Sequence, residues 1–133
     1  MKQKQTINAG WIVINKNNQV ALVKEHHTKY GFPKGHTEIG EHVLQTAYRE
    51  IQEETWLTKL LFKKYLGSIC RPHKGNDLSE IKIIHIFLFY TNEQYLCPQD
   101  SMHSAEWVDP KSVPVLLQHM QDKEFFTSCQ SYL

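Results

Sequence analysis

The feature that most limits the fold is one short amphipathic segment. From about His42 to Thr55, the apolar positions Val43, Ala47 and Ile51 recur every four residues, which is close to the period of an α-helix. These positions form one apolar face, because successive residues of a helix are rotated by about 100°. Such a face must be buried against another element. The rest of the chain therefore has to supply a surface that covers it.

Segments with the character of β-strands both precede and follow this helix. They read INAGWIVIN and QVALVKE before it, and LLFKKYLGSIC, IKIIHIFLFYT and the short AEWV after it. We interpret YGFPKGH as a loop, RPHKGNDLSE as the polar connection of a hairpin, and KSVPVLLQHMQDKEFFTSCQSYL as one or two closing helices. The economical architecture is an α/β (α+β) fold with helices packed on a mixed β-sheet. A chain of 133 residues predicts a single domain, 1–133.

The composition excludes several classes of protein. The hydrophobic fraction of 41% and the charged fraction of 22% are those of a globular protein, and the formal net charge is only +1. A near-neutral chain lacks the broad positive field that non-specific nucleic-acid binding requires, so we expect no nucleic acid and no membrane as partners. The three cysteines form no CxxC pair, which predicts a reducing, cytoplasmic location. The oligomeric state is not predicted.

Three glutamates lie near the C-terminal end of the predicted helix. Glu50, Glu53 and Glu54 fall within a sector of roughly 100° next to the apolar face. Like charges at this spacing repel one another, and the negative end of the helix dipole adds to the repulsion. The nearest cation, Arg49, cannot neutralise three carboxylates, whereas Mg²⁺ or Mn²⁺ can. Alternatively, the three glutamates form a solvated helix face.

The loop before the helix favours the metal. Gly35 offers a backbone carbonyl that a metal can approach without a side chain in the way. Lys34 offers a point charge suited to phosphate, although an ordinary exposed lysine has the same pattern. A loop of this kind followed by a helix with carboxylates suits a polyphosphate bridged by a metal.

Residues 35–57 resemble the Nudix box, G-x5-E-x7-R-E-U-x-E-E-x-G-U, in which U is aliphatic. The box positions are Gly35, Glu41, Arg49, Glu50, Ile51, Glu53, Glu54 and Leu57, all at the spacing of the family. The order of strands around the box is also similar to the Nudix fold, an α/β/α sandwich around a mixed sheet. The resemblance therefore covers nearly the whole chain.

The resemblance implies hydrolysis of a pyrophosphate linkage in a nucleoside diphosphate that is attached to another group. It implies Mg²⁺ or Mn²⁺ as cofactor, held by Glu50, Glu53, Glu54 and the carbonyl of Gly35. It also implies that Arg49 and Glu41 pair to hold the loop on the helix. Glu50 and Glu54 would stand closest to the attacking water and take its proton.

Two features leave alternatives open within the family. In some members the general base lies on a later loop, where Asp100 and Glu106 are the corresponding acids here; both can equally be exposed loop charges. The last glycine of the box is replaced by Trp56. A residue just past a helix often adopts a left-handed conformation that penalises bulky side chains, so Trp56 is either strained or packed on the core, and we expect packing.

The substrate is predicted from the loop and from the hairpin. GFPKGH before the box and LLQHMQDKEFF near the end look more similar to diadenosine tetraphosphate hydrolases than to MutT, in which Gly-Gly commonly replaces Lys34-Gly35. Distal phosphates would then contact Lys34 and three cationic side chains of the hairpin, Arg71, His73 and Lys74. The aromatic residues Tyr30, Phe32 and Tyr90 either stack on a base or belong to the core.

Three other functions are weighed against this one. A MutT-like enzyme would prefer a nucleoside triphosphate. A non-catalytic module would bind a nucleotide at the same place without cleaving it, and the replacement at Trp56 allows this alternative. Removal of pyrophosphate from the 5′ end of RNA would need a basic track, which the net charge of +1 does not favour.

Overall fold

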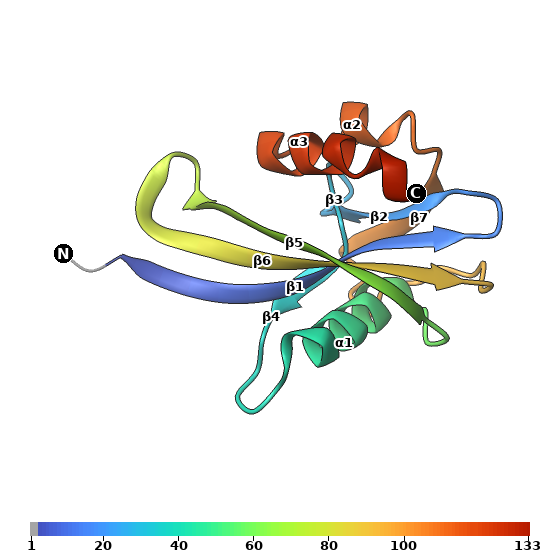
Figure 1. The fold of residues 1–133 in the computed structure, drawn as a ribbon, viewed down its shortest axis with the longest axis horizontal. Helices are drawn as coiled ribbons and strands as arrows, with labels where there is room; N and C mark the ends of the chain where they lie inside the picture. The colour runs from blue at the N-terminus through green and yellow to red at the C-terminus, as the bar shows by residue number, and fades with distance from the viewer. Residues whose placement is uncertain (1–2) are drawn as a thin grey trace.

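The computed structural model describes residues 3–133 as three layers (Figure 1). A mixed β-sheet lies in the middle, with helix α1 on one face and helices α2 and α3 on the other. This arrangement confirms the predicted α/β/α sandwich. In the described part of the chain, no helix is both long enough and apolar enough to span a bilayer.

The elements follow one another in a simple order. They are β1 (Lys4–Asn15), β2 (Val20–Glu25), β3 (Lys29–Gly31), β4 (Lys34–His36), α1 (Val43–Thr55), β5 (Leu61–Lys74), β6 (Asp77–Thr91), β7 (His103–Val108), α2 (Val113–Leu116), α3 (Met120–Ser128) and a closing 3₁₀ turn, Gln130–Tyr132. The main sheet has the order β3-β2-β1-β6-β5, while β4 pairs with β1 and β7 pairs with β2.

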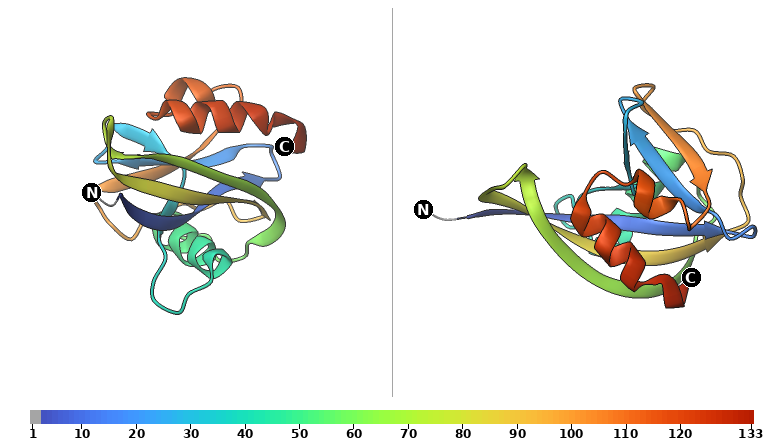
Figure 2. Two further views of the ribbon diagram at one scale, coloured as in Figure 1. Left: turned by 60° about the vertical axis from the view of Figure 1, so that its left-hand side comes forward. Right: turned by 90° about the horizontal axis from the view of Figure 1, so that it is seen from above.

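The centre of the sheet is a long parallel pair. β1 runs beside β6 from Lys4 opposite Glu80 to Asn15 opposite Thr91. The other pairs are antiparallel, so the sheet is mixed, as predicted. Seen from above in Figure 2, α3 lies across the sheet, and the hairpin of β5 and β6 extends beyond it toward the N-terminus.

Each face of the sheet has its own buried core. The core under α1 contains Ala9, Val13, Ala21, Phe87 and Phe89 from the strands and Ala47, Ile51 and Leu57 from the helix and its end. The core under α2 and α3 is built around Trp11, Ile12, Leu22, Phe32, Ile84, Ile86, Val113 and Phe126. The helix α1 thus buries the face that its spacing predicts.

A close approach brings β4 onto β1. The amide of Trp11 donates to the carbonyl of Pro33 (3.0 Å). A β-carbon at Gly10 would stand 2.1 Å from that same carbonyl oxygen, so only glycine allows the two strands to meet here. The contact places Lys34 opposite Gly10 and Gly35 opposite Ala9.

The structure corrects two segment boundaries. The segment YGFPKGH, predicted as a loop, contains the end of β3 and all of β4, because its backbone pairs with β2 and β1. The segment RPHKGNDLSE, predicted as a polar connection, is mostly strand, and the hairpin turns at Gly75 and Asn76. Polar composition indicated a loop, yet both segments satisfy their backbone groups by pairing.

Candidate active site

The start of α1 is fixed by a capping box. The side chain of His42 accepts from the amide of Leu44 (3.1 Å), and the side chain of Gln45 accepts from the amide of His42 (2.8 Å). Such reciprocal capping satisfies amides that the helix itself leaves free. The first turn is therefore anchored, which sets the direction in which the glutamates of the last turns project.

The carboxyl group of Glu50 lies against the backbone of Gly35. A β-carbon at residue 35 would stand 2.1 Å from Glu50 Cδ and 2.2 Å from Glu50 Oε2. Only a glycine leaves room for this carboxylate, so the two residues that the box predicts as metal ligands meet in space. The carboxyl is partly buried, and burial raises the pKa of Glu50, with the charge of Glu53 adding to the rise and Arg49 opposing it.

Arg49 holds the loop before the helix in place, as predicted. Its Nε donates to Glu41 Oε2 (2.8 Å) and its Nη2 to Glu41 Oε1 (2.9 Å) and to the carbonyl of His36 (2.9 Å). The hydrogen bonds from Arg49 and Thr46 lower the pKa of Glu41 to about 2. A bidentate pair of this kind is among the strongest that side chains form.

The same guanidinium reaches the glutamates of the box. Nη1 of Arg49 donates to Glu50 (2.7 Å) and lies 3.4 Å from Glu53, whose side chain is 39% exposed. One cation therefore lies within 4 Å of four carboxylates, because Glu38 is also 3.7 Å from Nη1. Its bonds to Glu41 and to the carbonyl of His36 use Nε and Nη2. The positive charge close to Glu50 and Glu53 is smaller than their negative charge.

Glu54 is the most enclosed of the three glutamates. Its Oε1 accepts from the amide of Lys34 (2.9 Å). Burial raises the pKa of Glu54 to about 8, with Glu50 adding to the rise and the Lys34 amide opposing it. Burial also lowers the pKa of Lys34 to about 8, with the charges of Lys82 and Arg71 adding to the fall. Burial thus disfavours the charged forms of both Glu54 and Lys34. A further cation beside Glu54 would stabilise its carboxylate.

The three glutamates and Gly35 are the candidate ligands of a divalent cation. Within residues 3–133, no group of three or more His, Cys, Asp or Glu side chains is assembled as a metal cage. Instead, Glu50 turns to Arg49 and Glu54 to the Lys34 amide. The donors are nevertheless hard oxygens, partly buried and short of positive charge, beside a glycine that leaves space. That chemistry fits Mg²⁺ or Mn²⁺, with Gly35, Glu50, Glu53 and Glu54 as the available ligands.

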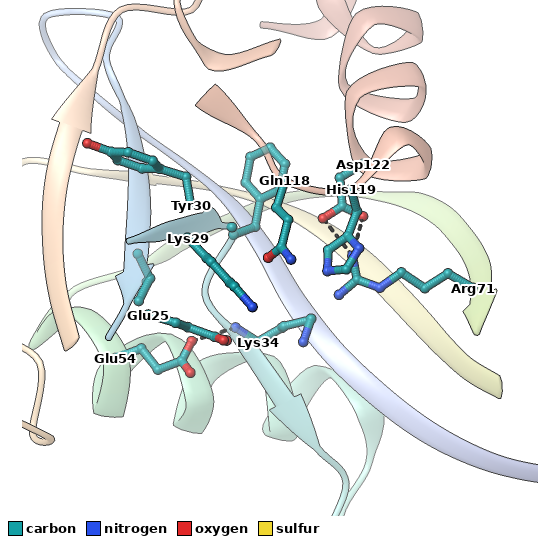
Figure 3. A pocket seen from close by; sticks show the side chains of 12 residues that line it. Glu25, Lys29, Tyr30, Lys34, Glu54, Arg71, Gln118, His119 and Asp122 are labelled. Atoms are coloured by element: carbon teal, nitrogen blue, oxygen red, sulfur yellow. Dashed lines mark hydrogen bonds and ion pairs between the residues drawn. The ribbon is translucent and has the colours of Figure 1, made fainter. Parts of the chain in front are cut away.

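A pocket contains Glu54 but none of the other glutamates of the box (Figure 3). It is lined by Val23, Glu25, Lys29, Tyr30, Gly31, Phe32, Lys34, Glu54, Arg71, Gln118, His119 and Asp122. Figure 3 shows the Lys34 side chain pointing from β4 toward the guanidinium of Arg71. The pocket is polar and contains cations at a short distance from the carboxylates of α1. Of the residues predicted to contact substrate, Lys34, Arg71, Tyr30 and Phe32 line it.

Arg71 is held in the pocket by a buried ion pair. Its Nη1 donates to both carboxylate oxygens of Asp122, each at 2.8 Å, and the two side chains are 5% and 2% exposed. Burial raises the pKa of Asp122, and Arg71 opposes the rise. Gln118 and His119 enter the pocket from the start of α3. Sequence reasoning missed these three residues, because 51 positions separate Arg71 from Asp122 and no local motif joins them.

Other predicted contacts lie elsewhere. His73 and Lys74 line a separate surface pocket at the tip of the hairpin, where His73 is 4.0 Å from Glu80. The phenol Oη of Tyr90 donates to Asn92, away from the pocket of Figure 3. The structure does not bring these side chains together with Arg71.

The two alternative acids also have structural partners. Asp100 accepts from the amide of Met102 (2.8 Å) and lies 3.4 Å from His103. Glu106 lies in β7, which contains the predicted strand AEWV, and accepts from the phenol of Tyr30 (2.8 Å). Neither lines the pocket beside Glu54.

Comparison with known proteins agrees with this geometry. The model of the NUDIX domain matches residues 4–129, which include the whole box. The chain belongs to the NUDIX family. The enzyme class expected from the box, a Nudix pyrophosphohydrolase, agrees with this membership.

Solved Nudix structures share the fold. A diadenosine tetraphosphate (Ap4A) hydrolase of Caenorhabditis elegans superposes with a TM-score of 0.78 at 18% identity, covering 96% of each chain. The MutT protein of Bacillus halodurans gives 0.74 at 23% identity, covering 92% of this chain and 80% of the other. The NUDIX domain of Shewanella oneidensis NrtR, complexed with ADP ribose, gives 0.74 at 14% identity, covering 99% and 89%.

The next-to-last position of the Nudix box is a strained residue. Trp56 has φ = 75° and ψ = 0°, the left-handed conformation, and its amide donates to the carbonyl of Gln52 (2.8 Å). Its side chain is 53% exposed. The expectation that the indole packs on the core is therefore wrong: the helix ends at Thr55 as glycine would allow, and tryptophan takes the steric penalty.

Proposed function

We propose that the protein hydrolyses, with Mg²⁺ or Mn²⁺, a pyrophosphate linkage in a nucleoside diphosphate attached to another group. The proposed substrate is a dinucleoside polyphosphate such as diadenosine tetraphosphate. One observation carries the proposal: Glu54 belongs both to the carboxylate face of α1 and to a pocket that contains Lys34 and Arg71. A polyphosphate in that pocket would lie beside the carboxylates.

The residues of the box have different proposed roles. Gly35, Glu50, Glu53 and Glu54 would hold the cation, which when bound supplies a Lewis acid for a phosphate oxygen and lowers the pKa of water. Glu50 and Glu54 would accept the proton of the attacking water, while the nucleotide would leave from phosphorus on the opposite side. Arg49 and Glu41 would hold the end of β4, which carries Gly35, and the loop after it against α1, through the hydrogen bonds described above.

The two cationic side chains of the pocket favour a substrate with a long phosphate chain. Lys34 and Arg71 come from different strands and meet on one side of Glu54 (Figure 3). Each suits a phosphate oxygen, Arg71 through its planar fork and Lys34 as a point charge. The C. elegans hydrolase, which shares the fold, is named for a substrate of this class.

A MutT-like preference for nucleoside triphosphates is the second enzymatic candidate, favoured by the fold shared with the MutT protein of B. halodurans. A nucleotide-binding module without cleavage is the third candidate. The strained Trp56, two residues after Glu54, favours that last candidate, because it adjoins the carboxylates that would hold the metal.

A substrate panel tests the proposal. The purified protein is incubated with diadenosine tetraphosphate, nucleoside triphosphates, nucleotide sugars and ADP-ribose, with Mg²⁺, with Mn²⁺ and with excess chelator. We expect the highest kcat/KM for diadenosine tetraphosphate and no turnover in chelator. A panel led by a triphosphate would support the MutT-like candidate, and nucleotide binding without turnover would support the binding module. Full turnover in chelator would refute the role of the metal.

A further inference from the structure

A row of polar side chains crosses the sheet on the face that carries α3. Residues opposite one another in paired strands project onto the same face. Arg71 on β5 is opposite Lys82 on β6, and Lys82 is opposite Thr6 on β1. Two residues along β1, Asn8 is opposite Ile84, whose side chain belongs to the core under α3. Asn8 and Lys82 therefore lie on the face toward which Arg71 and Asp122 also point.

Asn8 carries a buried donor without a partner. The residue is 1% exposed, and within residues 3–133 its Nδ2 has no hydrogen-bond acceptor. A buried amide left in this condition costs about 1 to 3 kcal/mol, so such groups are uncommon unless a ligand completes them. The next pair along β1 places Lys34 opposite Gly10, so Asn8 stands between the levels of Lys34 and Lys82.

The neighbours of Asn8 are also donors. Lys82 is half-buried, and burial lowers its pKa, with the charge of Arg71 adding to the fall. Arg71 uses Nη1 for Asp122, which leaves Nε and Nη2 as further donors. The carboxylates within electrostatic reach of Lys82 are Glu25, Glu80 and Asp122. Two cations and an amide thus lie on one face of three adjacent strands, and Asp122 is the acceptor hydrogen-bonded to one of the cations.

We propose that Asn8, Lys82 and Arg71 form an anion site that takes a phosphoryl group of the substrate distant from the bond that is cleaved. The site rests on the proposed function, because Arg71 belongs both to it and to the pocket beside Glu54. Lys34 and Lys82 are at levels of the sheet four residues apart on β1, roughly 13 Å. A polyphosphate chain can span that distance, whereas a single phosphate cannot, and the site would therefore favour dinucleoside polyphosphates. Asp122 acts as a positioning residue that orients Arg71.

Binding of inorganic tripolyphosphate in metal-free buffer, measured by isothermal titration calorimetry, tests the site without turnover. Asn8→Leu keeps the size of the side chain and removes the amide, and Lys82→Met removes one charge. Lys63→Met removes the same charge from the part of β5 that lies beside Tyr90, outside the pocket, and serves as the matched control. We expect Asn8→Leu and Lys82→Met each to weaken binding roughly tenfold, with Lys63→Met unchanged.

Stability separates this role from a structural one. Removal of a buried unsatisfied amide should leave the urea midpoint of Asn8→Leu unchanged or raised, while a structural role would lower it. In hydrolysis assays, the KM for diadenosine tetraphosphate should rise about tenfold in Asn8→Leu with kcat little changed. Failure of the wild type to bind tripolyphosphate, unchanged affinity in Asn8→Leu, or equal loss in Lys63→Met would each overturn the anion site. Absence of turnover with intact tripolyphosphate binding would instead overturn only the proposed enzyme activity.

Discussion

The carboxyl carbon of Glu50 lies 2.1 Å from the point where a β-carbon of Gly35 would stand. Gly35→Ala must therefore displace Glu50 or move β4 away from α1. A displacement of about 1 Å in a reacting group can cost about 10²-fold in rate, and we expect a loss of kcat of that size. Steady-state kinetics with Mg²⁺ measures it, and Mn²⁺ affinity should fall in parallel.

Gly31→Ala is the matched control for this change. No atom lies within 4 Å of a β-carbon built at Gly31, so this variant should keep the Mn²⁺ affinity and melting temperature of the wild type. Equal Mn²⁺ affinity in Gly35→Ala and the wild type would contradict the proposed use of Gly35 and Glu50 together.

Conversion of two partly buried glutamates to amides tests the chemistry. Glu54→Gln and Glu50→Gln keep the shape of each side chain and remove a metal ligand or proton acceptor. We expect each to lower kcat by about 10² or more. Glu93→Gln, on the loop where Glu93 accepts from the amide of Thr58, is a control of the same chemistry away from the pocket. Near-normal kcat in either box variant would show that its assigned role is wrong.

The strain at Trp56 predicts a stabilising substitution. Because φ is 75° and the indole is 53% exposed, Trp56→Gly should relieve the backbone at little cost in buried area. We expect the free energy of unfolding to rise by about 1 kcal/mol relative to Trp56→Ala, which removes the indole but keeps the strain. Urea midpoints at equal m-value measure the difference. A lower midpoint for glycine than for alanine would mean that the backbone at this residue is not strained.

The ion pair of Arg71 and Asp122 predicts a large effect on stability. Asp122→Asn leaves a guanidinium in a site where both side chains are at most 5% exposed. We expect a loss of about 3 to 5 kcal/mol, and a partial recovery in the double variant Arg71→Met, Asp122→Leu, since no charge is then buried alone. Glu80→Gln, whose partner Lys4 has a side chain that is 72% exposed, should change stability by less than about 0.5 kcal/mol. Chemical unfolding of these variants tests the expected order of their stabilities. An Asp122→Asn variant as stable as the wild type would refute it.

His119 predicts a dependence of stability on pH. Burial, together with the charges of Arg71, Lys34 and Lys82, lowers the pKa of His119 to about 4 from an ordinary value of 6.5. Between these two pH values the unfolded chain binds a proton that the folded protein does not, so stability falls as pH decreases from 6.5 to 4. In His119→Gln, the loss of unfolding free energy between pH 6.5 and pH 4 should be smaller by on the order of 1 kcal/mol. This figure already allows for the partial exposure of the ring, which weakens the effect of the shift. Thermal melts from pH 4 to 7 measure it; His26→Gln, at an exposed position, should keep the slope.

The box could be predicted from the sequence because its chemistry is local. Glu50, Glu53 and Glu54 lie within five positions, and the helical period alone brings them to one sector near the C-terminal end of α1. The pairing of Arg49 with Glu41 and the shared site of Gly35 and Glu50 are implied by the resemblance to the Nudix box, because Gly35 and Glu41 lie outside the helix. The strands could be placed as well, although their ends could not, because polar residues in β4 and at the tip of the hairpin resemble those of loops.

The rest of the pocket depends on contacts between distant segments. Asp122 reaches Arg71 only after α3 packs across the sheet, and Asn8 becomes a buried donor only because β4 and β6 enclose β1. No pattern within one element carries that information. Trp56 was misjudged for a different reason: a large apolar side chain usually indicates burial, whereas here the left-handed backbone turns it toward solvent.

The parallel pairing of β1 with β6 also determines when the active site can form. Thr6 Oγ1 donates to the carbonyl of Ile81, 75 positions later (3.5 Å). β1 can therefore pair with β6 only after β6 has been synthesised. Closing so long a loop costs chain entropy before the hydrogen bonds between β1 and β6 can form. The pairing of these strands is therefore slow relative to formation of the helix α1. The core under α1 contains Phe87 and Phe89 of β6, so α1 and its glutamates are fully packed only after that step. We therefore expect the carboxylates to become competent for metal late in folding, after residue 91 has left the ribosome.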